Sequence, residues 1–234
     1  MKRNQKLNFI NILICLFIFI LNVFYYNYFI IFKLPNHNYN QENNRLGIQN
    51  KIIVIGDSRM RAIKDIKEEL KIPKNVIFIA KSGARIDWLY DEATPELREI
   101  LKEKDNYRYH VVFNLGVNDL DEEINPNYIA EEYYDYYSKI IESNKDVSFY
   151  FLSVNPVDEN RIYKYFSMYN RRTNNKIKKF NNYFINRLNN EKISNTSYCD
   201  SYNELDFYLP DGLHYDTDTN KKIVKYIIEK CIKY

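Results

Sequence analysis

The chain has 234 residues, of which 45% are hydrophobic and 28% charged, a composition that excludes a wholly disordered chain and a fibre. The formal net charge of +3 comes from 34 Lys and Arg against 31 Asp and Glu. Lys2, Arg3 and Lys6 account for this excess, because 34 − 3 leaves 31 basic residues against 31 acidic ones. The body is therefore neutral, which argues against nucleic acid as a partner.

An apolar run, Leu7–Phe32, follows this basic flank and contains no charged residue. At about 1.5 Å per residue, a helix of this length exceeds the roughly 30 Å hydrocarbon core of a bilayer. We expect a transmembrane helix over 7–32, a cytoplasmic flank over 1–6, and a body outside the cytoplasm. A cleaved signal peptide is the alternative, but the run is long for one and no A-x-A-like site follows it.

The next segment, 33–50, is rich in Asn and Gln, contains Pro35 and has no apolar period. These properties predict a flexible tether. The remaining residues, 51–234, suffice for one α/β domain and leave no room for a second.

Within the body, continuously apolar segments alternate with segments of helical spacing, in chain order. Strands are predicted at 51–55, 75–80, 109–115 and 147–154, with a weak last strand at 197–200. Helices are predicted at 58–70, 94–103, 126–143, 172–190 and 217–232. The alternation predicts an α/β domain with a parallel sheet of about five strands and helices on both faces.

Cysteines are few. Cys15 lies in the apolar run, which leaves Cys199 and Cys231 in the body. Outside the cytoplasm these two residues could form a disulfide, or they could remain two buried thiols, and the sequence leaves both possibilities open. No Cys or His cluster has metal-ligand spacing, so we expect neither a metal nor another cofactor.

Binding sites of parallel α/β sheets lie outside the carboxyl ends of the strands. Four short segments follow predicted strands or precede the last helix: Gly56-Asp57-Ser58, Gly83, Gly116-Val117-Asn118-Asp119 and Asp211-Gly212-Leu213-His214. Each segment alone also fits an ordinary turn or helix cap. Their shared position at strand ends is what favours a site.

A serine on a tight strand-to-helix turn, such as Ser58, is exposed and can act as a nucleophile. Such a serine needs a base, and a carboxylate that orients the base. His37 lies in the tether and His110 begins a strand, at the opposite edge of the sheet. His214, three residues after Asp211, is therefore the candidate base.

Taken in order, the four segments resemble the conserved blocks of the SGNH (GDSL-type) hydrolase family, over 51–234. The resemblance implies a three-layer, flavodoxin-like fold and ester hydrolysis. It implies Ser58 as nucleophile and His214 as base, oriented by Asp211. It also implies an oxyanion hole formed by the Ser58 and Gly83 N–H groups and the Asn118 side chain.

The family's usual fourth residue in the first block is Leu, and this chain has Arg59 there. Arg59, Arg61 and Arg85 lie near the predicted site and could hold an anionic substrate. Solvated charges on a helix and a loop are the interpretation we prefer.

Two further side chains near the site have two interpretations each. Trp88 could line a sugar subsite, but a lone Trp after a loop more often packs under a helix. Asp57, like Asp119, is expected to support its turn through hydrogen bonds rather than to act as an acid.

These features together predict a membrane-anchored, extracytoplasmic serine ester hydrolase of bacterial type. Its partners would be the membrane and an ester-bearing small molecule or polysaccharide, with acetyl groups on cell-envelope carbohydrate as the suggested substrate. An O-acyltransferase with the same Ser-His-Asp site, or a non-catalytic envelope-binding module on the same fold, remain the alternatives.

Overall fold

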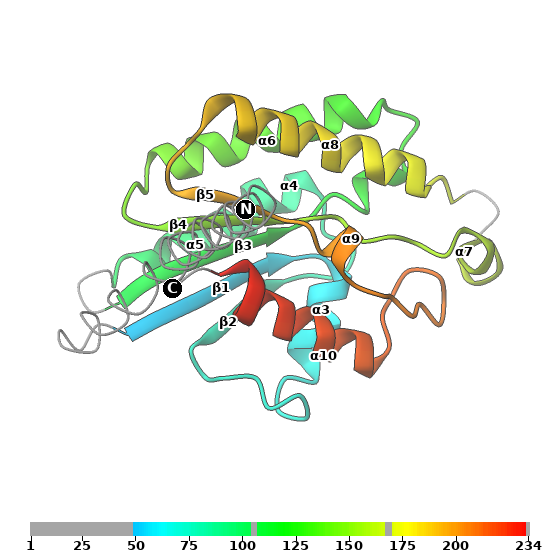
Figure 1. Ribbon diagram of the computed structural model, residues 1–234, viewed down its shortest axis with the longest axis horizontal. Coiled ribbons are helices and arrows are strands. Elements are labelled where there is room, and N and C mark those ends of the chain that lie inside the picture. Colours follow the sequence, from blue (N-terminus) through cyan, green and yellow to red (C-terminus); the bar gives the residue numbers. More distant parts are fainter. Residues whose placement is uncertain (1–48, 104–106, 167–169, 233–234) are drawn as a thin grey trace, which may run out of the picture. The chain divides into compact units, whose positions relative to one another are not determined.

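The computed structural model describes residues 49–103, 107–166 and 170–232. In this part of the chain five strands form one sheet in the order β2-β1-β3-β4-β5, and every neighbouring pair is parallel (Figure 1). The strands are β1 (Gln49–Gly56), β2 (Val76–Ala80), β3 (Tyr107–Asn114), β4 (Ser148–Leu152) and β5 (Thr196–Cys199). This strand order is that of flavodoxin-like folds, so the predicted α/β architecture is confirmed.

Helices cover both faces of the sheet. They are α3 (Ser58–Asp65), α4 (Ile86–Trp88), η1 (Leu89–Ala93), α5 (Thr94–Leu101), η3 (Asp119–Asp121), α6 (Pro126–Glu142), α7 (Glu159–Tyr165), α8 (Asn174–Glu191), α9 (Ser201–Glu204), α10 (Thr217–Tyr226) and η4 (Ile227–Cys231). Helices α6 and α8 lie on one face, and α3 and α10 lie on the other (Figure 1). Two covered faces explain why the central strands are continuously apolar.

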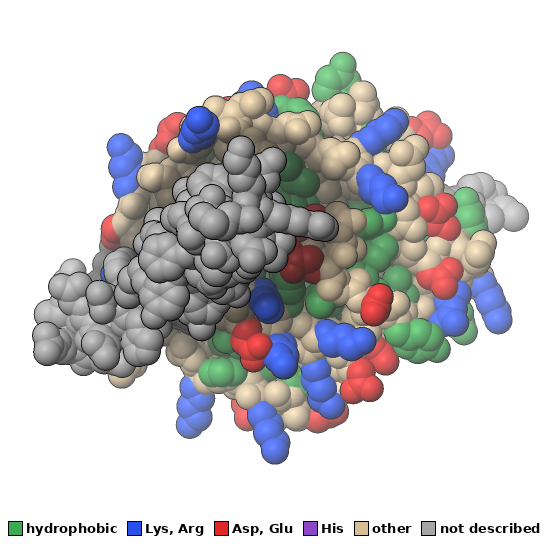
Figure 2. Space-filling model, in the orientation of Figure 1, with side chains coloured by type: hydrophobic (Ala, Val, Ile, Leu, Met, Phe, Trp, Pro, Cys, Tyr) green, Lys and Arg blue, Asp and Glu red, His purple; other side chains and the backbone are tan. Residues whose placement is uncertain are grey.

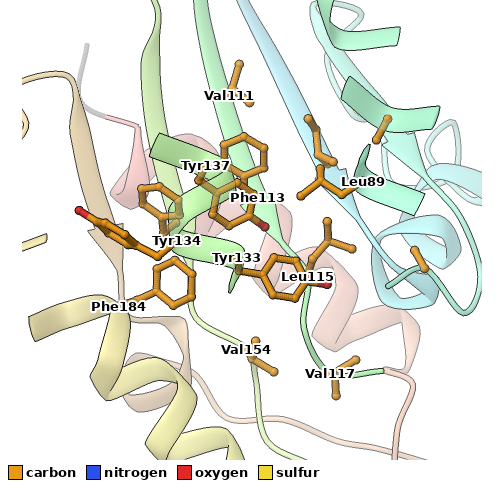
Figure 3. Close-up of a cluster of buried hydrophobic side chains, with 14 of the residues drawn as sticks. Leu89, Val111, Phe113, Leu115, Val117, Tyr133, Tyr134, Tyr137, Val154 and Phe184 are labelled. Carbon is orange, nitrogen blue, oxygen red and sulfur yellow. The ribbon is translucent and has the colours of Figure 1, made fainter. Parts of the chain in front are cut away.

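Aromatic side chains fill the layer between the sheet and helices α6 and α8. The ring of Phe113 in β3 lies 4.1 Å from that of Tyr137 in α6, centroid to centroid. Phe184 of α8 packs against the same Tyr137 ring at 6.0 Å, and Figure 3 shows these rings gathered under the helices. Three of the chain's tyrosines, Tyr133, Tyr134 and Tyr137, are thus core residues, at most 3% exposed.

Several elements differ from the sequence-based expectation, and three of these differences lie near the site or the tether. Strand β1 begins at Gln49, inside the segment expected to be tether. Helix α3 ends at Asp65, short of the predicted end at residue 70. Helix α7 forms where a loop was expected, because Asp158 caps its first turn and Ile162 anchors it in the core. A short polar helix with one buried residue has no apolar periodicity to reveal it.

Cys199 and Cys231 form a disulfide, with their Cα atoms 5.3 Å apart. The bond joins the carboxyl end of β5 to η4, the last helical segment. The alternative of two free thiols is therefore wrong. The bond closes a loop between residues 32 positions apart, which ties the end of the chain to the edge strand of the sheet.

The predicted membrane span over 7–32 and the tether as far as residue 48 lie outside the described residues. Among the residues that are described, no helix is both long and apolar enough to cross a bilayer. Lys, Arg, Asp and Glu side chains are interspersed over the face drawn in Figure 2, in keeping with the neutral charge of the body.

Candidate active site

The carboxyl ends of the three strands β2, β1 and β3 meet at one edge of the sheet. Gly56, the last residue of β1, pairs with Ala80 on one side and Asn114 on the other. A Cβ atom on Gly56 would lie 2.2 Å from the Cγ of Met60. Only glycine therefore allows α3 to begin so close behind β1, and this close turn places Ser58 at the sheet edge.

Asp57, not Ser58, caps helix α3. The Asp57 Oδ1 accepts the backbone N–H of Arg59 at 2.9 Å, and the carboxyl is buried. Burial raises the pKa of Asp57, and the nearby Arg59 charge opposes this shift. The expectation that Asp57 supports the turn is confirmed, and the Ser58 hydroxyl is left available for another contact.

That contact is with His214. The Ser58 Oγ lies 2.9 Å from the His214 Nε2, and the His214 Nδ1 lies 2.7 Å from the Asp211 Oδ2. The Asp211 Oδ1 accepts the backbone N–H groups of Leu213, at 2.8 Å, and His214, at 2.7 Å. A hydroxyl, an imidazole and a carboxylate, separated by up to 156 positions in the chain, thus form one hydrogen-bonded line.

The hydrogen bonds also define the charge state of the carboxyl. Burial acts to raise the pKa of Asp211, but hydrogen bonds from the His214 ring and from two backbone N–H groups outweigh it and hold the pKa below its ordinary value. An ionised carboxylate only accepts hydrogen bonds, so the His214 Nδ1 carries the proton. In the neutral imidazole, the lone pair of Nε2 is then directed at the Ser58 hydroxyl.

Helix α7 packs directly against the loop that carries His214. The backbone N–H of Asp158 donates to the Gly212 carbonyl at 2.9 Å. Gly212 has φ +90°, and a Cβ atom there would lie 2.4 Å from the Ile162 backbone nitrogen, so the contact requires glycine. The Phe166 ring, which follows α7, lies 5.9 Å from the His214 ring.

Asn118 and the Gly83 segment lie together. The Asn118 Nδ2 donates to the carbonyl of Ala84, next to Gly83, at 3.0 Å, and the Asn118 side chain is buried. The Asn118 Oδ1 accepts from the Arg172 Nη2 at 3.2 Å. Gly83 has φ +73°, and a Cβ built there meets no atom within 4 Å, so the space beside it is open.

Arg172 holds this corner of the site. Its Nε donates to the Val117 carbonyl at 2.9 Å, and its Nη1 pairs with the Asp121 carboxylate at 3.2 Å. Only 11% of its side chain is exposed. The Arg172 side chain therefore connects the start of α8 to the Asn118 turn.

The three arginines predicted near the site differ in their exposure to solvent. Arg59 is 1% exposed, so its interpretation as a solvated charge is wrong. Arg61 is exposed and pairs with Asp65, and Arg85 is half-buried and pairs with Glu122, so both charges remain in contact with solvent.

Two further predictions are confirmed. Trp88, the last residue of α4, is buried in the hydrophobic core, and its Nε1 donates to Glu92 at 3.2 Å. His110 is the fourth residue of β3 and does not begin the strand as expected, but it does lie away from the carboxyl end. It contacts Tyr150 and Asn50, and burial lowers its pKa to about 4.

Among the residues that the structure covers, no group of three or more His, Cys, Asp or Glu is placed to hold a metal ion. Sequence reasoning missed the site contacts of Arg59, Arg172 and Phe166. Arg59 is adjacent to Ser58, which was the one signal that could have marked it. Arg172 and Phe166 come from distant segments and carry no such signal.

A comparison with protein families assigns the chain to a family. Residues 52–227 match the model of the GDSL-like lipase/acylhydrolase family. The chain belongs to this family, whose members are ester hydrolases as a class. The comparison with curated proteins found no match.

Among the solved structures with the same fold, three have differently named proteins and TM-scores from 0.54 to 0.59. A Streptococcus pneumoniae protein provisionally named a platelet activating factor has a TM-score of 0.59 and 16% identity, over 89% of this chain and 97% of its own. A G-D-S-L family lipolytic protein from Veillonella parvula has a TM-score of 0.55 and 14% identity, over 77% and 97%. The acetyl xylan esterase AlAXEase has a TM-score of 0.54 and 17% identity, over 78% and 100%.

Proposed function

We propose that the protein is a serine ester hydrolase that acts outside the cytoplasm and removes O-acyl groups, acetyl in particular, from cell-envelope carbohydrate. The observation that carries the proposal is the hydrogen-bonded line from Ser58 through His214 to Asp211. Family membership supports ester hydrolysis as the class of reaction. The individual roles below are our assignment.

In the proposed reaction the Ser58 Oγ attacks the ester carbonyl carbon, and the His214 Nε2 takes the hydroxyl proton. Asp211 holds the ring in this orientation and stabilises the imidazolium that forms. The carbonyl oxygen, now negatively charged, is bound by the N–H groups of Ser58 and Gly83 and by an N–H of Asn118. One N–H of the Asn118 amide already donates to Ala84, and the other is the one assigned to this oxygen.

His214 then returns the proton to the leaving alcohol, which departs and leaves Ser58 as an acyl ester. Water, activated in turn by His214, attacks the acyl carbon, and the acid is released with free Ser58. The atoms balance as one ester and one water converted to one alcohol and one acid. The residues described supply every proton transfer, so the proposal requires no metal and no cofactor.

Two observations support a location outside the cytoplasm. The Cys199–Cys231 disulfide is typical of oxidising compartments. The basic flank and the uncharged run Leu7–Phe32 are typical of a membrane anchor with its N-terminus in the cytoplasm. We propose that the chain is anchored over 7–32 and tethered over 33–48, because strand β1 already begins at Gln49.

Carbohydrate acetyl esters are the proposed substrate because a protein with this fold is an acetyl xylan esterase and because an anchored body would face the cell envelope. The same triad would also serve an O-acyltransferase, with a sugar hydroxyl in place of water.

The experiment is an ester panel on the full chain in mild detergent, with Ser58→Ala as control. The panel contains p-nitrophenyl esters of increasing acyl length and acetylated polysaccharides. We expect hydrolysis of acetyl esters, loss of activity in Ser58→Ala, and fluorophosphonate labelling of the wild type alone. If the main product is acylated saccharide and not free acid, the protein is an O-acyltransferase and the proposal of a hydrolase is wrong. Equal labelling of the two proteins would remove Ser58 as nucleophile and favour a binding module.

Location has its own measurement. Protease added to intact cells should cleave the body if it lies outside the membrane, whereas cleavage only after lysis would overturn the proposed location.

A further inference from the structure

We propose that Arg59 is a positioning residue that holds the loop carrying His214 at hydrogen-bonding distance from Ser58. This inference rests on the proposed function, because it assigns Arg59 to the same site. Arg59 follows Ser58 directly in the first turn of α3, and its side chain is buried, 1% exposed. A buried guanidinium is rare in proteins and has to be compensated by hydrogen bonds.

Every arm of the Arg59 guanidinium donates to a backbone carbonyl. Nε donates to the Leu213 oxygen at 2.9 Å, Nη1 to the Asn155 oxygen at 2.8 Å, and Nη2 to the Pro156 oxygen at 2.9 Å. These carbonyls belong to the His214 loop and to the segment that follows β4. One planar group therefore joins three segments at the carboxyl edge of the sheet: the Ser58 turn, the segment after β4 and the His214 loop.

The bond to Leu213 is the one that bears on the chemistry, because Leu213 immediately precedes His214. Both of their backbone N–H groups donate to the Asp211 Oδ1, so Leu213 and His214 belong to one tight turn. Any displacement of the Leu213 carbonyl is therefore transmitted to the His214 ring, which lies 2.9 Å from the Ser58 Oγ.

The surroundings of Arg59 keep its side chain in this conformation. The guanidinium carbon lies 5.0 Å from the centroid of the Tyr215 ring, within the range of a cation–π contact. The charge of Arg59 favours the ionised form of the buried Asp57 carboxyl, which caps the same turn. The guanidinium is therefore held through its charge as well as through its hydrogen bonds.

The geometry depends on a guanidinium. Its donors lie in one plane at fixed angles, so they can satisfy three carbonyls that approach from different segments. Lysine has a single ammonium on a flexible stem and cannot reproduce that fork. Leucine, the usual residue of this block in the family, would leave these three carbonyls without their donor. The Arg59 side chain therefore joins the turn that carries Ser58 to the loop that carries His214, through hydrogen bonds that a leucine side chain could not make.

The test compares Arg59→Lys, Arg59→Leu and Arg61→Leu in the full-length protein. Arg61 is the matched control, because it lies on the same helix, is exposed and pairs with Asp65. For p-nitrophenyl acetate we expect kcat to fall about 100-fold in both Arg59 variants, with KM changed less than about twofold, because a small displacement of a catalytic group slows chemistry more than binding. Arg61→Leu should match the wild type in both constants.

A double-mutant comparison separates positioning from a general loss of structure. If Arg59 acts through His214, adding Arg59→Lys to His214→Ala should cost the residual rate less than about twofold. An equal loss in both backgrounds would overturn the proposal, as would a folded Arg59→Leu protein with wild-type kcat. Should Arg59→Leu fail to fold, Arg59→Lys is judged by the same criteria.

A spectroscopic readout keeps this inference separate from the proposed function. The Nδ1 proton of His214, held by Asp211, should give a downfield proton NMR signal that His214→Gln lacks. We expect Arg59→Lys to shift or broaden this signal and Arg61→Leu to leave it unchanged. An unchanged signal in Arg59→Lys would overturn the positioning role, whereas a wild type that shows this signal but neither hydrolyses esters nor reacts with fluorophosphonate would overturn only the proposed function.

Discussion

Arg172 donates from its Nη2 to the side-chain oxygen of Asn118 at 3.2 Å, and this bond decides how the Asn118 amide is oriented. A guanidinium only donates hydrogen bonds, so the amide must turn its oxygen toward Arg172 and its NH2 group the other way. The NH2 group then donates to the Ala84 carbonyl, beside Gly83. The orientation that the proposed oxyanion hole needs is therefore held from both ends of the amide.

Replacing Asn118 by Ala should slow the reaction severely and leave the fold intact. Loss of one oxyanion donor costs about 2.7–4 kcal/mol of barrier, or about 10²–10³ in kcat. Steady-state kinetics with p-nitrophenyl acetate measure the loss, and thermal melting checks the fold. A folded variant whose kcat stays within about threefold of the wild type would show that Asn118 is not an oxyanion donor.

Replacing Arg172 by Met should lower kcat through Asn118. Without its donor, the amide is free to turn its oxygen toward the site, and we expect a loss of about tenfold, the size of one hydrogen bond to a charged group. In an Asn118→Ala background the same change should cost almost nothing further. Arg171→Met is the matched control, because Arg171 is 47% exposed and pairs with Glu123. Full additivity of the two losses would contradict the coupling.

Asp211→Asn should give a folded protein with a misoriented base. The backbone N–H groups of Leu213 and His214 keep the asparagine oxygen at the Oδ1 position, so the NH2 group faces Nδ1. An NH2 group cannot accept a hydrogen bond from Nδ1–H, and the ring is no longer held in the tautomer that directs Nε2 at Ser58. In the best-studied triads this change costs about 10⁴ in kcat, and we expect a loss of about 10³–10⁴ here. Asp216→Asn, which changes the capping residue of α10 instead, should have little effect on kcat. Comparable losses in both variants would point to general damage.

The buried carboxyl of Asp119 should make stability fall as pH rises. Burial raises its pKa from an ordinary 3.8 to about 6, although it accepts hydrogen bonds from Tyr133 and the Ile86 N–H. A raised pKa means that the folded state binds the proton more tightly, so this stabilisation is complete below about pH 4 and is lost as pH rises through about 6.

Asp119→Asn lacks this titration. The difference in unfolding free energy between wild type and variant should therefore shift by about 3 kcal/mol against the wild type between about pH 4 and pH 7. Urea unfolding over this range measures the shift. A difference that stays constant with pH would show that Asp119 keeps an ordinary pKa.

Removing the disulfide should destabilise the protein. The Cys199–Cys231 bond spans 32 positions, and closing a loop of this size stabilises the fold by about 3–4 kcal/mol. Cys199→Ser combined with Cys231→Ser should lose this amount in urea unfolding. Wild type reduced with dithiothreitol serves as the comparison and should match the variant. Equal stability of the oxidised and reduced proteins would contradict the prediction.

Much of the fold could be predicted because its central strands are continuous apolar runs, and Ile52 to Ile55 are indeed at most 1% exposed. The line from Ser58 to His214 was predictable because each residue lies at a strand end or beside a helix start. Arg59 was not predictable in the same way. A charged residue is normally exposed. The three carbonyls that accept hydrogen bonds from the buried Arg59 side chain belong to residues 96 to 154 positions away in the chain.

Strand β1 runs from Gln49 to Gly56. The polypeptide therefore enters the domain at the amino ends of the strands, and the nucleophile Ser58 lies at their carboxyl ends. The eight residues of β1 separate these two ends by about 25 Å. A domain attached through its N-terminus would present Ser58 on the side away from the attachment. In the anchored enzyme that we propose, the whole length of strand β1 therefore lies between the tether and Ser58.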